Sequence, residues 1–174
     1  ILDEIGQILE IQGENPFKVR AYHNGARTLE GLGDPVAHWV VNKTLSDLPG
    51  IGPALQEKIT ELVETGRLKY YNDLRTSIPE GLLDLLRIPS VGPKKVKTLW
   101  HELDITNIRK LESACHNNKL AALRGFGEKS QIKILEGIRF IQSHRNQFRL
   151  GDALPVALEW IDYLKTSKDL QRIS

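Results

Sequence analysis

The sequence contains no methionine, and its first residue is isoleucine. Because translation starts with methionine, we expect these 174 residues to be a fragment of a longer protein. No apolar run approaches the roughly 18 residues of a membrane-spanning helix, and the acidic, amphipathic N-terminus is unlike a signal peptide. These absences predict an intracellular, cytoplasmic protein that does not contact a membrane.

Cysteine occurs once, at Cys115, which excludes an internal disulfide framework and any cysteine-rich zinc site. The five histidines show no paired metal-ligand spacing. We therefore expect Cys115 to be a structural thiol and the histidines to lie at the surface.

An excess of charge is also missing, since 24 lysines and arginines oppose 22 aspartates and glutamates and give a net charge of +2. So small a total does not by itself indicate a nucleic-acid partner, although a pI near 8.7 is compatible with one. The distribution of the basic residues therefore matters more than their number.

The sequence does have apolar residues at helical spacing in nearly every segment. Examples are Ile1, Ile5 and Ile8, and then Leu55, Ile59 and Leu62. Alternating strand patterns are almost absent. The apolar content of 40% can fill the core of one large domain or two small ones. We therefore predict an all-α protein of about ten short helices.

Proline and glycine mark the expected helix boundaries. Asn15-Pro16 and Asp34-Pro35 each place a capping side chain before a proline at the first helical position. Gly66 is well placed as a left-handed cap that ends a helix begun near Pro53.

An internal repeat is the most informative feature of the sequence. Its copies are residues 48–53 (Leu-Pro-Gly-Ile-Gly-Pro), 88–93 (Ile-Pro-Ser-Val-Gly-Pro) and 123–128 (Leu-Arg-Gly-Phe-Gly-Glu). Each copy is an apolar residue, a turn, a small-apolar-Gly triplet and the start of a helix. The triplets begin 40 and 35 residues apart, which leaves room for one helical hairpin and a connector in each unit.

A Gly-apolar-Gly turn before a helix is suited to binding DNA. Glycine permits positive φ and the close approach of a ligand, and the following helix presents unpaired amides to a phosphate oxygen. This pattern is the helix-hairpin-helix motif, which contacts phosphates rather than base edges, so we expect sequence-independent, salt-sensitive binding. The expected DNA backbone-binding residues are Gly50, Ile51, Gly52, Ser90, Val91, Gly92, Lys94, Lys95, Gly125 and Gly127.

Basic residues accompany the three copies unequally. Lys94, Lys95 and Lys97 follow the second copy, whereas Lys58 and Lys129 lie near the first and the third. Lysines at a helix N-terminus complement a phosphate but oppose the helix dipole, so stability alone would not favour them. We expect the first two copies to contact DNA and the third to serve folding more than DNA contact.

Four further segments are informative because of their order along the chain. They are residues 14–22 (Glu-Asn-Pro-Phe-Lys-Val-Arg-Ala-Tyr), 26–30 (Ala-Arg-Thr-Leu-Glu), 64–68 (Glu-Thr-Gly-Arg-Leu) and 86–95 (Leu-Arg-Ile-Pro-Ser-Val-Gly-Pro-Lys-Lys). Together they resemble the N-terminal half of bacterial and archaeal family X DNA polymerases, relatives of polymerase beta. The resemblance covers essentially the whole chain.

The resemblance implies two small helical subdomains of the polymerase beta N-terminal and SAM-like kind. Residues 1–72 would form a lyase-like domain with the first hairpin, residues 73–150 a fingers-like domain with the other two, and residues 151–174 a helix leading into a palm domain. The parent protein would be a gap-filling DNA polymerase of base excision repair, associated with the nucleoid. Its catalytic carboxylates and their Mg²⁺ belong to the palm, so the fragment alone is not expected to polymerise.

In this family the first domain binds the 5′-phosphate side of a gap and, in many members, removes a 5′-deoxyribose phosphate. The resemblance makes Lys58 the Schiff-base lysine of that lyase reaction. It places Lys18 and Tyr22 in the 5′-phosphate pocket, where Arg20 and Arg27 would add positive charge.

The pocket departs from the family pattern at three positions. Phe17 stands where polymerase beta has a histidine, and Ser46 and Ala54 stand where it has lysines. These losses are expected to weaken 5′-phosphate binding. The alternative for Lys58 itself is a solvated side chain paired with Glu57 or Glu61.

The resemblance also implies a monovalent cation, K⁺ or Na⁺, at the turns, where it would bridge to a phosphate. Its ligands would be the backbone carbonyls of Leu48 and Ile51 in the first turn, and of Ile88 and Val91 in the second.

Three functions stay open. The first is binding of gapped or nicked duplex DNA by a monomer, as part of a repair polymerase. The second is a non-enzymatic helix-hairpin-helix module of a nuclease or helicase subunit, and the third is a protein-interaction surface. Tyr70 and Tyr71, directly after the Gly66 turn, are expected at a joint between subdomains.

Overall fold

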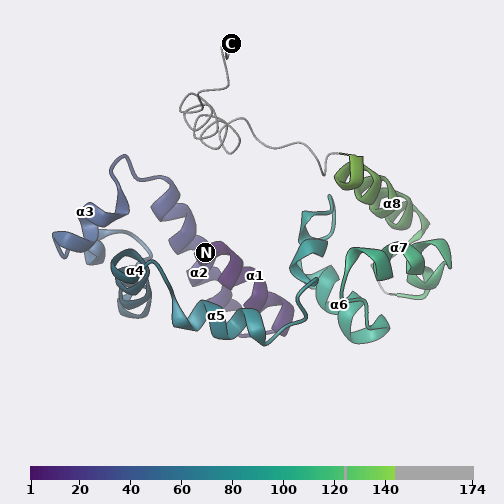
Figure 1. The fold of residues 1–174 in the computed structure, drawn as a ribbon, viewed down its shortest axis with the longest axis horizontal. Coiled ribbons are helices and arrows are strands. Elements are labelled where there is room, and N and C mark those ends of the chain that lie inside the picture. The colour runs from purple at the N-terminus through teal and green to yellow at the C-terminus, as the bar shows by residue number, and fades with distance from the viewer. Residues whose placement is uncertain (124, 144–174) are drawn as a thin grey trace, which may run out of the picture. The chain divides into compact units, whose positions relative to one another are not determined.

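A computed structural model describes residues 1–123 and 125–143, and every regular element in these ranges is a helix (Figure 1). The α-helices are α1 (Leu2–Gln12), α2 (Pro16–Glu30), α3 (Val36–Val41), α4 (Pro53–Thr65), α5 (Lys69–Thr76), α6 (Pro93–Leu103), α7 (Ile108–His116) and α8 (Glu128–Ser143). Three short 3-10 helices are η1 (Leu45–Asp47), η2 (Leu83–Arg87) and η3 (Lys119–Ala122). The predicted all-α class is confirmed.

The contacts divide the chain into two units. Residues 1–138 form one compact unit, and residues 139–174 are grouped apart from it. The boundary expected at residue 72, inside the first unit, stays a prediction. The helix expected in residues 151–174 lies outside the described residues.

The N-terminal core forms where α1 packs on α2, and buried side chains of α4 contribute to it. Most of its buried side chains come from positions with helical spacing, so the apolar residues that recur at this spacing in the sequence are the ones that the fold buries. They are Leu2, Ile5, Leu9, Val19, Tyr22, Ala26, Leu45, Leu48, Ile51, Leu55, Ile59 and Leu68. Each fully buried large apolar side chain contributes about 1.5–3 kcal/mol to folding.

The later helices of the first unit bury a second set of apolar side chains. They are Leu82, Leu85, Ile88, Val91, Val96, Leu99, Ile105, Leu111, Ala114, Cys115, Leu120, Phe126, Ile134 and Ile138. Burial raises the pKa of the Cys115 thiol to about 11, so it is the structural thiol that the sequence indicated. Helix α1 contacts α2, α5 and α6 (Figure 1).

Two glycines set how closely a supporting helix approaches a hairpin turn. A Cβ at Gly25 of α2 would lie 2.9 Å from Leu55 Cδ1 in the first hairpin. A Cβ at Gly137 of α8 would lie 2.9 Å from Ile88 Cγ2 and 3.0 Å from Pro89 Cδ in the second. Each turn is thus held by a helix that lies directly against it.

Two of the three expected helix boundaries are confirmed. The Asn15 side chain accepts a hydrogen bond of 2.9 Å from the Phe17 amide, and Gly66 ends α4 with φ of 69°. The cap predicted at Asp34 is wrong. Helix α3 begins after Pro35, whose ψ of 135° is extended, and no side chain caps it.

The described helices were also compared with the requirements of a membrane span. None of them is both long enough and apolar enough to cross a bilayer.

Candidate nucleic-acid interface

The three copies of the repeat fold alike. Each is a 3-10 helix, a turn and an α-helix, so that η1 leads to α4, η2 to α6 and η3 to α8. The first triplet residue has positive φ in every copy, with 79° at Gly50, 69° at Ser90 and 87° at Gly125. The sequence repeat is therefore a repeat of backbone conformation.

One backbone hydrogen bond closes each turn in the same register. The amide of the middle triplet residue donates to the carbonyl three residues before it. These bonds are Ile51 N to Leu48 O at 3.2 Å, Val91 N to Ile88 O at 3.0 Å, and Phe126 N to Leu123 O at 3.1 Å. All three middle side chains are buried, which anchors each turn to the core.

The last glycine of each triplet, unlike the first residue, does not have positive φ. Gly52 has φ of −78° and Gly92 has φ of −97°, both with extended ψ, a conformation open to any residue. A Cβ at Gly52, Gly92 or Gly127 would have no atom within 4 Å. The fold therefore does not require glycine at these three positions, and glycine leaves room there for a ligand to approach the backbone.

Unpaired amides surround these glycines. Pro53 and Pro93 begin α4 and α6 and have no N–H group. Among the described residues, no acceptor pairs with the amides of Gly52 and Ala54 in the first hairpin, or of Gly92 and Lys94 in the second. Such amides at the positive end of a helix form an anion site when a phosphate oxygen comes close.

The lysines of the second hairpin point in different directions. Lys94 is exposed and has no side-chain partner among the described residues. Lys95 Nζ donates to the Ser90 carbonyl at 2.9 Å and lies 5.7 Å from the centre of the Phe126 ring. Lys95 therefore links the second and third turns, while Lys94 is available to a phosphate.

The first turn lies beside an open hollow of about 700 Å³. Residues 48–55 line it together with Ala21, Ser46 and Asp47. Its only charged lining side chain, Asp47, is acidic. The first turn therefore offers amides without a lysine, and the second offers both amides and Lys94.

The positive φ of Ser90 leads to a stability prediction. A non-glycine residue in the left-handed region is strained, so Ser90→Gly is expected to stabilise the protein by about 1 kcal/mol. For a domain of this size the melting temperature should rise by about 2–4 °C. Thermal unfolding followed by circular dichroism measures the change. Ser90→Ala is the control and should give no gain, and a Ser90→Gly variant that melts no higher than wild type would contradict the prediction.

Lys58 lies on α4, at its partly buried edge. Its Nζ donates to the Ala54 carbonyl at 3.2 Å and lies 5.0 Å from the centre of the Tyr70 ring. No carboxylate is within ion-pair distance of Lys58 in the described part of the chain. Glu61 accepts a hydrogen bond of 2.8 Å from the Lys69 amide instead. The structure therefore does not show the ion-paired alternative for Lys58.

Lys18 and Tyr22 lie one turn apart on α2, beside the same tyrosine. The rings of Tyr22 and Tyr70 are stacked, with centres 6.2 Å apart and planes at 14°. Lys18 Nζ is 2.8 Å from Glu14 Oε2, and this hydrogen bond raises the pKa of Lys18, with a further contribution from the Tyr70 hydroxyl. Burial raises the pKa of Tyr22. The structure thus brings Lys18, Tyr22 and Lys58 together around Tyr70.

Arg20 and Arg27 are not part of this group. At 100° per residue they lie roughly 160° and 180° around α2 from Lys18. The Arg20 guanidinium lies 4.7 Å from the centre of the Phe17 ring, and 74% of Phe17 is exposed. The positive charge that these arginines were expected to add therefore lies on the other side of the helix.

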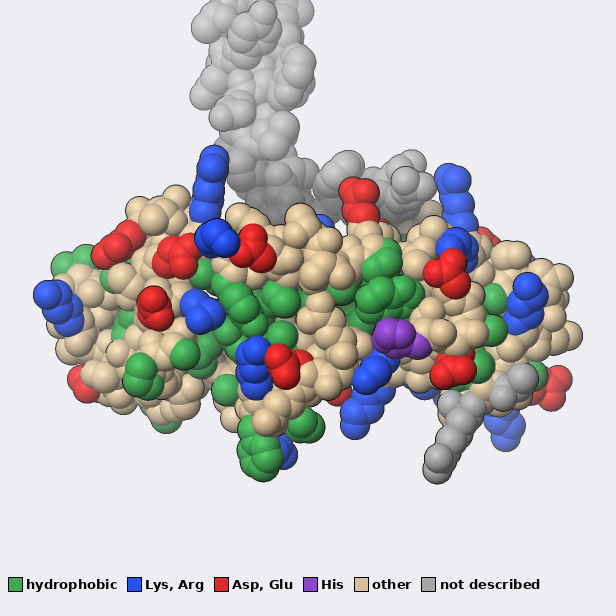
Figure 2. All heavy atoms as spheres, turned by 90° about the horizontal axis from the view of Figure 1, so that it is seen from below, with side chains coloured by type: hydrophobic (Ala, Val, Ile, Leu, Met, Phe, Trp, Pro, Cys, Tyr) green, Lys and Arg blue, Asp and Glu red, His purple; other side chains and the backbone are tan. Residues whose placement is uncertain are grey.

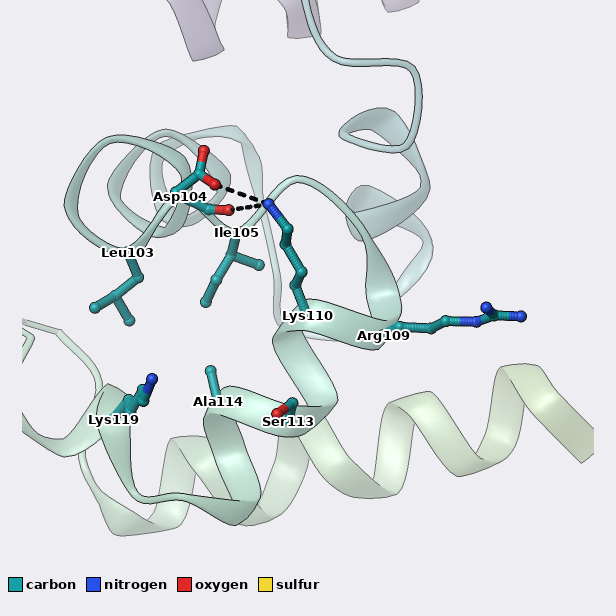
Figure 3. A pocket seen from close by; sticks show the side chains of 8 residues that line it. All are labelled: Leu103, Asp104, Ile105, Arg109, Lys110, Ser113, Ala114 and Lys119. Carbon is teal, nitrogen blue, oxygen red and sulfur yellow. Dashed lines mark hydrogen bonds and ion pairs between the residues drawn. The ribbon is translucent and has the colours of Figure 1, made fainter.

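On the face drawn in Figure 2 the charge of the described residues is mixed rather than concentrated. Figure 2 shows Lys and Arg side chains interleaved with Asp and Glu side chains across one face. A second hollow, of about 400 Å³, lies between α6 and α7 (Figure 3). There Lys110 Nζ is held by Asp104 Oδ2 at 2.8 Å and Asp104 O at 3.0 Å, and Arg109 points away from the hollow. Neither feature forms a basic patch like those of many DNA-binding proteins.

Comparison with known proteins agrees with this geometry. A helix-hairpin-helix domain model matches residues 1–68, and a SAM-like helix-hairpin-helix tandem model matches residues 82–139. DNA polymerase/3'-5' exonuclease PolX of Bacillus subtilis (strain 168) is 33% identical over 164 residues, which are 94% of this chain. This chain is therefore similar to PolX over nearly its whole length, and it contains two helix-hairpin-helix regions. It spans 28% of the length of PolX.

Tyr70, at the centre of the group formed by Lys18, Tyr22 and Lys58, is the residue that the sequence does not predict to lie there. It was assigned to a joint because it follows the Gly66 turn, and its contacts with Lys58 and Tyr22 come from two other helices. Aromatic residues at the start of a helix carry no local signal for such contacts.

The turn carbonyls fit the expected monovalent cation unequally. In the first turn the Ile51 carbonyl accepts a hydrogen bond of 3.1 Å from Gln56 Nε2, which occupies one of the expected ligands. No side chain of the described residues donates to the Val91 carbonyl of the second turn. The described residues also contain no cluster of three or more His, Cys, Asp or Glu that could hold a metal ion. The Val91 carbonyl is therefore open where the Ile51 carbonyl is not, while the Lys95 ammonium lies on the neighbouring Ser90 carbonyl at 2.9 Å.

Proposed function

We propose that this chain binds gapped or nicked duplex DNA through the phosphates, as the N-terminal region of a family X DNA polymerase. The observation that carries the proposal is the pair Gly52 and Gly92. The fold leaves open space at both glycines, and unpaired amides flank them. Bound phosphate oxygens account for both facts, and they account for the lack of sequence-reading side chains in the turns.

The parent protein is proposed to fill gaps during DNA repair. Its relative PolX is named as a DNA polymerase and 3'-5' exonuclease. The polymerase carboxylates and their Mg²⁺ would belong to a palm domain, and the first unit of this chain would hold the DNA for it. A monovalent cation on the Ile88 and Val91 carbonyls would strengthen the phosphate contact of the second hairpin.

We further propose a 5′-deoxyribose phosphate lyase reaction at Lys58. The amine attacks the C1′ aldehyde of the sugar, and loss of water leaves an iminium ion. A base then removes the C2′ proton, and the C2′–H electron pair forms the C1′–C2′ double bond of an enamine while the iminium nitrogen takes up the C=N pair. The nitrogen pair next re-forms the C1′=N bond, the C1′–C2′ pair moves to form a C2′–C3′ double bond, and the C3′–O bond breaks with its electrons on the departing phosphate. Hydrolysis releases the sugar and restores the amine. Lys18 would exchange its ion pair with Glu14 for the phosphate.

The salt dependence of DNA binding tests the proposed phosphate contacts. We expect the affinity for a gapped duplex to fall linearly on a log–log plot against salt, with a slope of about −2 or steeper, because two hairpins contact at least two phosphates. Fluorescence anisotropy with several unrelated sequences measures it. Affinity that is equal for all sequences and steep in salt supports the proposal.

Two outcomes of the same titration point elsewhere. Negligible affinity at low salt would leave the turns as protein-interaction surfaces. Strong sequence preference would mean that base edges are read, which contradicts the proposal. Replacing K⁺ by tetramethylammonium at constant ionic strength tests the cation, because a site of carbonyl ligands cannot hold so large an ion and affinity should fall.

A further inference from the structure

The first step is the location of Tyr70, which lies in the first turn of α5 between α4 and α2. Its ring centre is 5.0 Å from Lys58 Nζ and 6.2 Å from the centre of the Tyr22 ring. Tyr22 is 6% exposed, so it supports the Tyr70 ring from the core side. Tyr70 therefore forms a fixed aromatic wall beside the lysine.

The connection between α4 and α5 fixes this wall. Thr65 Oγ1 donates to the Arg67 carbonyl at 2.8 Å and accepts from the Arg67 amide at 3.1 Å. Leu68 is 1% exposed, and Glu61 Oε1 accepts from the Lys69 amide at 2.8 Å. The start of α5 is thus tied directly back to α4, which carries Lys58.

A lysine side chain has four rotatable bonds, so it loses considerable conformational entropy when it is held in one direction. An aromatic face attracts a cation, and the iminium ion formed from Lys58 is a cation just as its ammonium form is. The attraction therefore persists when the Schiff base forms. No carboxylate of the described residues forms an ion pair with Lys58 and so competes with the ring for its charge.

We propose that Tyr70 is a positioning residue of the lyase site, whose ring holds Lys58 toward the sugar bound beside Lys18. This inference rests on the proposed lyase function of Lys58. The inference is that the aromatic ring of Tyr70, and not its hydroxyl group, positions Lys58. The family pattern of pocket lysines, which this chain lacks at Ser46 and Ala54, is replaced here by an aromatic contact.

Borohydride trapping of the intact chain on a gapped duplex with a 5′-deoxyribose phosphate tests the inference. At saturating DNA, Tyr70→Leu is expected to trap about 3- to 10-fold more slowly than wild type, which is the value of one cation–π contact. Tyr70→Phe keeps the ring and should trap within about twofold of wild type. DNA affinity, measured separately by anisotropy, should stay the same in both variants.

Tyr71→Leu is the matched control, because it makes the same change at the neighbouring residue, away from Lys58. It should trap as wild type does. The inference is overturned if Tyr70→Leu traps at the wild-type rate, if Tyr70→Phe is as slow as Tyr70→Leu, or if the loss of rate is only a loss of affinity.

A spectroscopic readout separates this inference from the proposed function. If wild type does not trap at all, the lyase proposal fails, and the contact is then tested by the NMR shifts of the Lys58 Cε methylene protons. An aromatic ring beside them moves these signals upfield. Tyr70→Leu should abolish the upfield shift and Tyr70→Phe should keep it. Identical shifts in wild type and Tyr70→Leu would overturn the positioning role whatever the activity.

Discussion

Replacing Gly52 and Gly92 together by alanine is expected to weaken binding to gapped DNA by about 100-fold. Each added methyl group stands between the helix N-terminus and the phosphate, so it lengthens or breaks the amide contacts there. A tenfold loss at each site corresponds to about 1.4 kcal/mol, and sites in two separate hairpins that share no partner should contribute additively. Anisotropy titrations of the single and double variants measure the effect.

The same substitutions should leave the fold intact. Both positions have ordinary negative φ and open space for a Cβ, so the free energy of unfolding should be unchanged or higher by up to about 1 kcal/mol, through a less flexible unfolded chain. Gly66→Ala is the control with the opposite expected result. Its φ of 69° strains alanine, so this variant should lose about 1 kcal/mol of stability and keep its DNA affinity.

If the double variant binds DNA as tightly as wild type, the turns are not the phosphate sites. If it binds weakly but has also lost stability, the glycines serve the fold and the argument from open space fails. Only loss of affinity at full stability agrees with a ligand that needs the space.

The turns were predictable from the sequence because they are local. Each copy determines its own hydrogen bond, its own buried middle residue and its own helix start, within six residues of chain. The helix class followed for the same reason, from apolar spacing. The prediction at Asp34 was wrong because Pro35 can precede a helix as well as begin one: its ring fixes φ but not ψ, and its ψ of 135° is extended.

The side chains around Lys58 were less predictable because they come from three helices. Lys18 and Tyr22 were identified only through the family resemblance, and Tyr70 was not identified at all. Arg20 was assigned to the same pocket from its charge, although helix geometry already places it on another face of α2. Lys95 was expected to contact DNA, and only the packing of the third hairpin shows its contact with Phe126.

The second large effect is expected at Lys58. Lys58→Ala should lower borohydride trapping on the 5′-deoxyribose phosphate substrate by about 100-fold or more, because no Schiff base forms without the amine. Lys58→Arg keeps a positive charge at this position but supplies no competent nucleophile, so it should trap as poorly as Lys58→Ala. Both variants should bind gapped DNA within a few-fold of wild type, since the hairpin amides are untouched.

Lys69→Ala is the matched control for a lysine that is near Tyr70 in sequence but exposed. Its ammonium is paired with Asp73 at 2.8 Å and its side chain is 84% exposed, so its removal should not change trapping. If Lys58→Ala traps equally well, another amine carries the reaction, and mass spectrometry of the reduced adduct identifies it. If wild type binds gapped DNA but neither wild type nor any variant forms a trapped adduct, the non-enzymatic DNA-binding alternative is the correct one. The trapping and binding measurements together therefore separate chemistry at Lys58 from DNA binding at the hairpins, because the chemistry depends on the Lys58 amine and the binding on the backbone amides of the turns.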